Sequence, residues 1–128
     1  MRERKLYDNG TLQIHRTADP LGLAMCGQID ELGYQGLVSA IEEITRKAAG
    51  EIHVDLTHVT YCDLAGLWAI IRMTQSSPTS CRRVVLHRLP LRLETVLRVI
   101  GWSATPGLIL ADGSARSRSR PGNPTGAS

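Results

Sequence analysis

Four histidines are the side chains of this 128-residue chain that best suit acid–base chemistry, because imidazole is the usual general base in enzymes. His15 and His53 occupy polar positions of segments in which apolar and polar residues alternate. His58 lies in a predicted connection, and His87 lies at the end of a predicted strand. No serine or cysteine motif that would form a nucleophile accompanies them. We therefore expect a protein that is not an enzyme.

The three cysteines are the other candidates for chemistry. Cys26, Cys62 and Cys81 are odd in number and form neither a CxxC motif nor a Cys/His ligand set. We expect reduced, mostly buried thiols, with no disulfide, no metal and no cofactor. Cys62, next to Asp63, is the best candidate for a reactive thiol, but no activating base is recognisable beside it. We interpret it as a small buried apolar residue.

Charge is distributed unevenly along the chain. Residues 1–63 carry six basic and ten acidic side chains, whereas residues 64–128 carry nine and two. With only two Trp, three Tyr and no nucleic-acid-binding motif, specific binding of DNA or RNA is not expected. We interpret the basic residues of the second half as a solvated face that could meet an acidic protein partner: Arg82, Arg83, Arg88, Arg92 and Arg98.

The composition is that of one globular domain, with 42% hydrophobic and 21% charged residues. We assign residues 1–110 to it, with residues 1–10 forming either an additional strand or an arm. The Ser, Arg, Pro and Gly residues of 111–128 bury too little apolar surface to fold, so we expect a disordered tail. No apolar run reaches the roughly 20 residues of a membrane span, and Met1 to Lys5 lack a signal peptide's apolar stretch. These features favour a cytoplasmic protein.

Period-two alternation and short apolar runs predict the strands of the domain. The first two are expected to pair as a hairpin. The second, ended by Gly27, is a continuous apolar run of the kind that is buried on both faces. The predicted strands are residues 12–15, 21–26, 51–56, 83–86 and 108–110.

Helical spacing of apolar residues predicts three helices between these strands. The first begins near Leu37 and ends before Gly50, which we expect in the left-handed conformation. The second follows a connection at 57–62 and has Asp63 as its N-cap. The third has Pro90 at its first position and ends at Gly101. The apolar stripe of the second helix contains Leu64, Leu67, Trp68 and Ile71, and the helix is closed by Ser76, Ser77 and Pro78.

This order of elements predicts an α/β fold. We expect a mostly parallel mixed β-sheet of about five strands, with a hairpin at its beginning. Three to four helices are expected to pack mainly on one face of the sheet.

Two short segments carry a resemblance to a known family. GQID at 27–30 lies where a strand passes into a helix, and VDLTHVTYCDLAGL at 54–67 leads into the second helix. Together they resemble the STAS domain, the family of the bacterial anti-sigma factor antagonists, over roughly residues 11–110. The resemblance implies a STAS-like fold and a module that binds another protein without performing a reaction. The positions that match the family pattern are Gly27, Asp30, Asp55, Leu56, Asp63, Gly66 and Leu67.

The chain departs from the family pattern at one position. In switching members a serine follows the aspartate and is phosphorylated by a cognate anti-sigma kinase, whereas this chain has Leu64 there and Ala65 next. Neither side chain accepts phosphate, and Thr57, Thr60 and Tyr61 are too distant along the chain to replace the serine. The resemblance therefore implies a member that is either permanently competent to bind or outside the phosphorylation circuit.

The resemblance also implies a partner and a surface for it. The expected partner is an anti-sigma factor with a histidine-kinase-like ATPase fold, whose capture would free a sigma factor; a homodimer also stays open. The expected partner-binding residues are Gly27, Asp30, Thr60, Tyr61, Cys62, Asp63, Leu64, Ala65, Gly66 and Leu67.

Two alternative functions stay open at this point. One is a non-switching STAS subunit that packs on the ATPase of an ABC transporter of the lipid-transport type. The other is an accessory protein that binds a ligand in an apolar pocket near Leu64 and Trp68. An anion at the start of the second helix is not favoured, because Asp63 already supplies a negative charge there.

Overall fold

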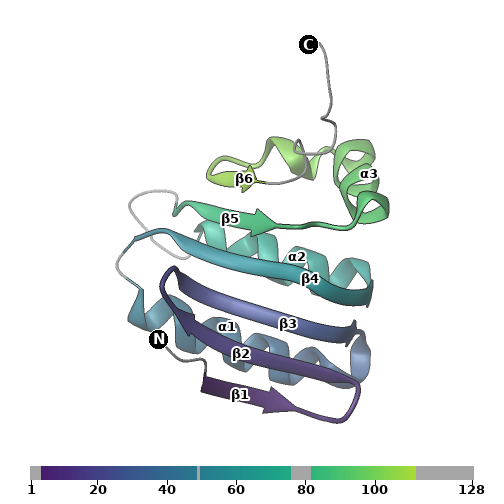
Figure 1. The fold of residues 1–128 in the computed structure, drawn as a ribbon. Helices are drawn as coiled ribbons and strands as arrows, with labels where there is room; N and C mark the ends of the chain where they lie inside the picture. The colour runs from purple at the N-terminus through teal and green to yellow at the C-terminus, as the bar shows by residue number, and fades with distance from the viewer. Residues whose placement is uncertain (1–3, 49, 76–81, 112–128) are drawn as a thin grey trace.

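The protein is described from a computed structural model, which covers residues 4–48, 50–75 and 82–111. Six strands form one sheet in which every strand lies beside its neighbours in sequence (Figure 1). The first three strands run antiparallel to one another, and the last four run parallel. The strands are β1 (Arg4–Asp8), β2 (Leu12–Ala18), β3 (Leu21–Ile29), β4 (Ile52–Cys62), β5 (Val84–His87) and β6 (Leu108–Leu110).

Three α-helices follow strands β3, β4 and β5. They are α1 (Tyr34–Lys47), α2 (Leu64–Ile71) and α3 (Leu91–Ile100). Three short 3-10 helices are η1 (Glu31–Gly33), η2 (Arg72–Gln75) and η3 (Trp102–Ala104). None of the helices in these described ranges is long and apolar enough to cross a membrane.

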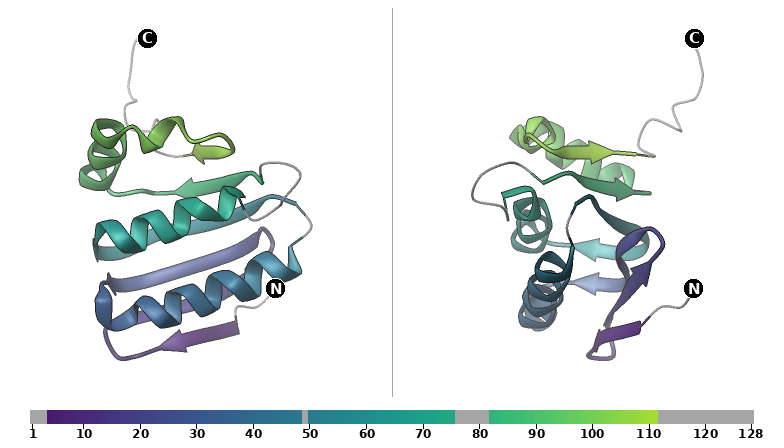
Figure 2. Two further views of the ribbon diagram at one scale, coloured as in Figure 1. Left: turned by 180° about the vertical axis from the view of Figure 1, so that it is seen from behind. Right: turned by 90° about the vertical axis from the view of Figure 1, so that its left-hand side faces the viewer.

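The helices α1 and α2 lie side by side on one face of the sheet (Figure 2). The core forms between them and the sheet, because Leu23 of β3, Leu37 of α1 and Leu67 of α2 are buried there together. In the part of the chain that is described, no helix covers the central strands on the opposite face, which we call the open face. The mixed α/β fold is therefore confirmed, with a sixth strand because residues 4–8 pair with β2.

The open face explains why one prediction for β3 is wrong. Leu23 and Met25 point into the core, but Cys26 is exposed and Ala24 is only half-buried. The apolar run is thus not buried on both faces, and Cys26 is not the buried thiol that its type suggested. The three predicted turn residues at 76–78, Cys81 and residues 112–128 of the predicted tail lie outside the described residues.

Strands β3 and β4 are both longer than predicted. Gly27 does not end β3; it lies at a bulge with a positive φ of 106°, and the strand continues to Ile29. The segment 57–62 is not a connection but the second half of β4, so His58 is an exposed strand residue. Polar side chains are compatible with these two strand segments because the segments border the open face, which no described helix covers.

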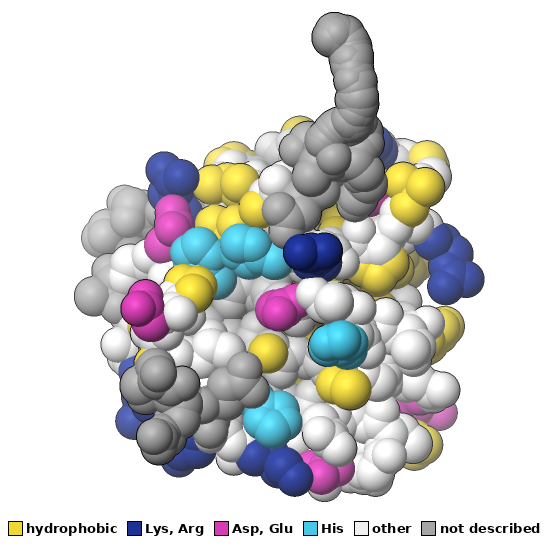
Figure 3. Space-filling model, in the orientation of Figure 1, with side chains coloured by type: hydrophobic (Ala, Val, Ile, Leu, Met, Phe, Trp, Pro, Cys, Tyr) yellow, Lys and Arg dark blue, Asp and Glu magenta, His cyan; other side chains and the backbone are white. Residues whose placement is uncertain are grey.

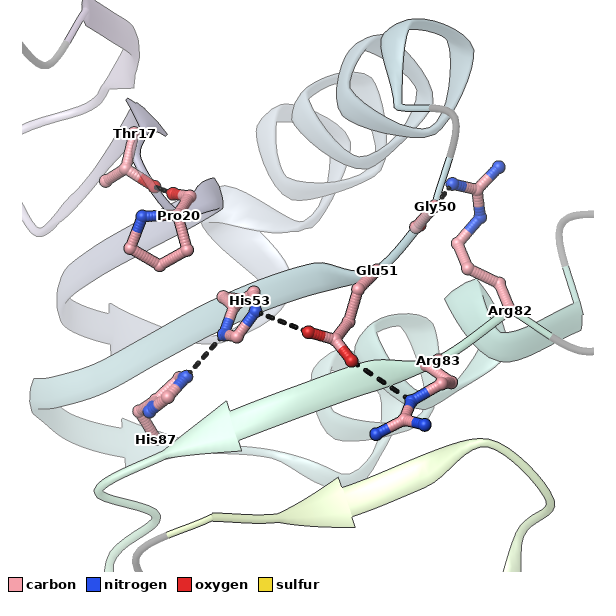
Figure 4. Close-up of polar contacts among 8 residues, drawn as sticks. All are labelled: Thr17, Pro20, Gly50, Glu51, His53, Arg82, Arg83 and His87. Atoms are coloured by element: carbon pink, nitrogen blue, oxygen red, sulfur yellow. Dashed lines mark hydrogen bonds and ion pairs between the residues drawn. The ribbon is translucent and has the colours of Figure 1, made fainter.

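The ends of two helices also differ from the predictions. Gly50 is not left-handed; Ala48 ends α1 in an extended conformation, and the guanidinium of Arg82 donates to the carbonyls of Ala48 and Gly50 at 3.0 and 2.9 Å (Figure 4). Arg82 therefore satisfies free carbonyls at the helix end instead of lying on a solvated face. Pro90 is the N-cap of α3 rather than its first residue, whereas the helix ends at Gly101 as predicted, and this glycine is left-handed.

Candidate functional site

Asp63 joins the end of β4 to the start of α2. Its backbone N–H donates to the carbonyl of Ile29 at 3.0 Å, which fixes the ends of β3 and β4 together. Its side-chain Oδ1 accepts from the N–H of Gly66 at 2.8 Å, which confirms the predicted N-cap. A carboxylate at this position satisfies a helix N–H that would otherwise lack a partner, and its negative charge interacts favourably with the positive end of the helix dipole.

Of the four residues after Asp63, the first two are exposed and the next two are buried. Leu64, the first residue of α2, is 52% exposed, and Ala65 is exposed beside it. Gly66 is buried, and a Cβ there would lie 2.4 Å from Cγ2 of Ile29. Leu67 is 0% exposed. Gly66 and Leu67 therefore lie beneath the exposed surface that Leu64 and Ala65 form.

Exposed apolar side chains gather at the edge where β3, β4 and β5 end. Large hydrophobic residues are usually exposed only singly, so several at one edge of a sheet indicate an interaction surface. Parallel strands end at the same edge, so the residues that follow them lie close together. We call four exposed residues at this edge the apolar rim: Leu32, Tyr61, Leu64 and Leu91.

Leu32 and Leu91 were not expected in this surface from the sequence. Leu32 belongs to η1, directly after β3, and Leu91 is the first residue of α3. A signal was present for Leu91, which directly follows Pro90 at the predicted start of the third helix, whereas Leu32 precedes the predicted start of the first helix near Leu37. Only the strand order brings them to the edge that holds Leu64.

A cavity of about 330 Å³ opens beside the rim, between the end of β4 and the start of α3. Its walls are mostly apolar, and the Arg92 side chain and the Asp63 carboxylate contribute opposite charges to it. This volume and lining fit an apolar side chain of a partner or a small apolar ligand. The lining residues are Val59, Thr60, Tyr61, Cys62, Asp63, Leu64, Pro90, Arg92, Leu93 and Val96.

Asp30 and Gly27, the other expected contact residues, have separate places. Asp30 caps η1, accepting from the N–H of Leu32 at 3.0 Å, and lies at the same edge as the rim. Gly27 lies within β3, where its carbonyl accepts from Oγ1 of Thr60 at 3.2 Å. Asp30 therefore borders the exposed surface, whereas Gly27 acts through the backbone that shapes β3.

Cys62 lies at the end of β4 and is half-buried beneath the rim. Burial, and to a smaller extent the adjacent Asp63 carboxylate, raise the pKa of its thiol to about 12. The nucleophilic thiolate is therefore almost absent at neutral pH. Cys62 is unsuited to covalent chemistry here.

We expect alkylation to distinguish the two described cysteines. Cys26 is exposed, so iodoacetamide at pH 7.5 should modify it readily in the native chain. Cys62 should react more than about a hundredfold more slowly, because burial holds its thiol protonated. Peptide mapping by mass spectrometry over time measures both rates. Equal modification of both residues in the folded protein would contradict this assignment, and equal modification in denaturant is the control.

Fold and site together define a binding module of the α/β class. The chain matches the family model described as "Mlab, STAS domain" over residues 12–111. This match covers most of the chain, and the protein belongs to the STAS domain family. No curated protein matches it.

Proposed function

We propose that this STAS domain is a non-enzymatic regulatory module that binds a partner protein through the apolar rim. The observation that carries the proposal is Leu64: an exposed leucine stands at the first position of α2, directly after the capping Asp63. Burying this side chain against a partner removes apolar surface from water, which favours association. Asp30, Thr60 and Ala65 border the rim and extend the proposed contact surface.

The proposed binding is not switched by a phosphate on α2. A phosphate would add nearly two negative charges at the helix start, but this requires a hydroxyl, and Leu64 has none. The nearby threonines are engaged in the sheet: Oγ1 of Thr57 contacts Oδ1 of Asp55 at 2.5 Å, and Oγ1 of Thr60 donates to Gly27. These contacts support a surface that stays competent to bind.

The proposed partner is an anti-sigma factor with a histidine-kinase-like ATPase fold, as the family resemblance implies. A second candidate is the ATPase of an ABC transporter. It is favoured by the same observation, because a permanent subunit needs an apolar surface and no switch. The two candidates differ in the expected lifetime of the complex, which is longer for a subunit than for a regulator.

The partner class can be tested by purifying candidate anti-sigma factors and ABC ATPases from the host and titrating each with the untagged chain in a calorimeter. Saturable one-to-one binding to an anti-sigma factor supports the first candidate, and binding to an ABC ATPase supports the second. Binding to neither class overturns the proposal of a partner of this kind.

We expect the native chain to take up no phosphate at residues 60–67 when it is incubated with ATP and the kinase-like partner. The variant Leu64→Ser restores a hydroxyl at the first helical position and should gain about 80 Da, the mass of one phosphate, if the kinase reaches this site. Intact-mass spectrometry and peptide mapping measure the outcome. A phosphate on Thr60 or Tyr61 of the native chain would contradict the proposed loss of the switch.

A further inference from the structure

Four side chains form a continuous polar chain on the open face (Figure 4). Nδ1 of His53 on β4 lies 2.7 Å from Nε2 of His87 on β5. Nε2 of His53 lies 2.9 Å from Oε1 of Glu51, and the other carboxylate oxygen of Glu51 lies 3.0 Å from Nε of Arg83. The space-filling view shows histidine side chains gathered on this face (Figure 3).

The Glu51 carboxylate decides which nitrogen of His53 carries the proton. A carboxylate only accepts, so Nε2 of His53 must donate to it. Nδ1 of the neutral ring then holds a lone pair directed toward His87. A carboxylate that orients a histidine in this way is the usual outer partner of metal-binding histidines, because it fixes the tautomer and the orientation of the ring. Arg83 in turn holds Glu51 in place.

The separation of the two facing nitrogens fits a particular coordination geometry. With metal–nitrogen bonds of about 2.0–2.1 Å, a 90° angle at the metal requires nitrogens about 2.9 Å apart, and a tetrahedral angle requires about 3.3 Å. The observed 2.7 Å between Nδ1 of His53 and Nε2 of His87 is closer to the first value. Tetragonal sites with nitrogen and oxygen ligands are typical of Cu²⁺ and Ni²⁺.

We propose that His53 and His87 form a two-histidine site for a tetragonal divalent transition-metal ion, Cu²⁺ or Ni²⁺, with Glu51 as the residue that orients His53. The ion would bind Nδ1 of His53 and Nε2 of His87 as neutral imidazoles, with the proton of His87 on its Nδ1. Binding would require both half-buried rings to turn, because their nitrogens now face each other and must instead face a common ion. No electron transfer is involved, and the ion takes the place of the hydrogen bond.

The remaining coordination positions would be filled by water from the open face. Within the described residues, no three His, Cys, Asp or Glu side chains converge on one metal position. Asp55 is paired with His87 in the sheet register, but its Oδ1 accepts from the N–H of Thr57 at 2.9 Å. The site is therefore open, and we expect moderate affinity that any competing chelator removes.

Titration of the untagged full chain with Ni²⁺ in a calorimeter tests the site. Ni²⁺ is the probe because the exposed Cys26 thiol would reduce Cu²⁺. We expect one ion per chain, with binding weakened at least tenfold by His53→Ala or His87→Ala. Glu51→Gln should weaken it about tenfold through loss of the orienting carboxylate.

His58→Ala is the matched control, because His58 is an exposed histidine on the same strand, β4, outside the pair. Its binding should stay within twofold of that of the native chain. Paramagnetic broadening of the His53 and His87 ring signals in nuclear magnetic resonance spectra requires no substitution, so it decides the case if a variant fails to fold. Unchanged binding in both pair variants, or broadening confined to other histidines, would overturn the proposal and leave the four residues as a hydrogen-bonded chain.

Discussion

Replacing Gly27 by alanine is expected to lower the free energy of unfolding by about 3 kcal/mol or more. A Cβ at this position would lie 2.0 Å from the carbonyl oxygen of Thr11. That oxygen cannot move freely, because it accepts from the N–H of Gln28 at 2.9 Å. The substitution therefore adds the strain of a side chain at a φ of 106° to the loss of a backbone hydrogen bond.

Gly10→Ala provides the matched control for this experiment. Gly10 also has a positive φ, 94°, but a Cβ there meets no atom within 4 Å. Its substitution should cost only the backbone strain of roughly 1 kcal/mol. Urea denaturation of both variants measures the difference. If the two variants lose the same free energy of unfolding within about 0.5 kcal/mol, β3 must shift to make room for the Cβ at Gly27. The short distance to the Thr11 carbonyl would then not explain the glycine.

The parts of the fold that sequence could predict are those in which one face of an element is buried. Leu12 and Ile14 of β2 alternate with polar residues, and Ile52, Val54 and Leu56 of β4 do the same, so the period of two is visible. The second half of β4 was missed because Thr57, His58 and Thr60 are polar and exposed. Only Val59 is buried there, so the period of two is not visible. A strand next to solvent loses the apolar signal that marks it.

The candidate site was predictable only where a local rule applied. The N-cap role of Asp63 follows from its own side chain and the next three residues, so the prediction was confirmed. The exposure of Leu32 and Leu91 depends on which strands are neighbours and on which face the helices cover. The pairing of His53 with His87 is also tertiary, because 34 residues separate them.

The substitution Leu64→Asp is expected to weaken binding of the proposed partner at least about thirtyfold, which corresponds to roughly 2 kcal/mol. The change removes an apolar contact and places a carboxylate where the interface would exclude water. The fold should tolerate the substitution, because Leu64 is 52% exposed. A negative charge at the first position of α2 also interacts favourably with the positive end of the helix dipole. The free energy of unfolding should therefore change by less than about 1 kcal/mol.

Val99→Asp carries the same change to an apolar residue that is 81% exposed near the end of α3, outside the rim. Calorimetric titration of the purified partner should give a dissociation constant within twofold of that of the native chain for this variant. Equal weakening by both variants would indicate a nonspecific effect of charge, and unchanged binding by Leu64→Asp would place the contact surface elsewhere. Leu64→Asp is expected to weaken binding while leaving the free energy of unfolding nearly unchanged. A loss of affinity in a folded variant therefore assigns Leu64 to the interface rather than to the core.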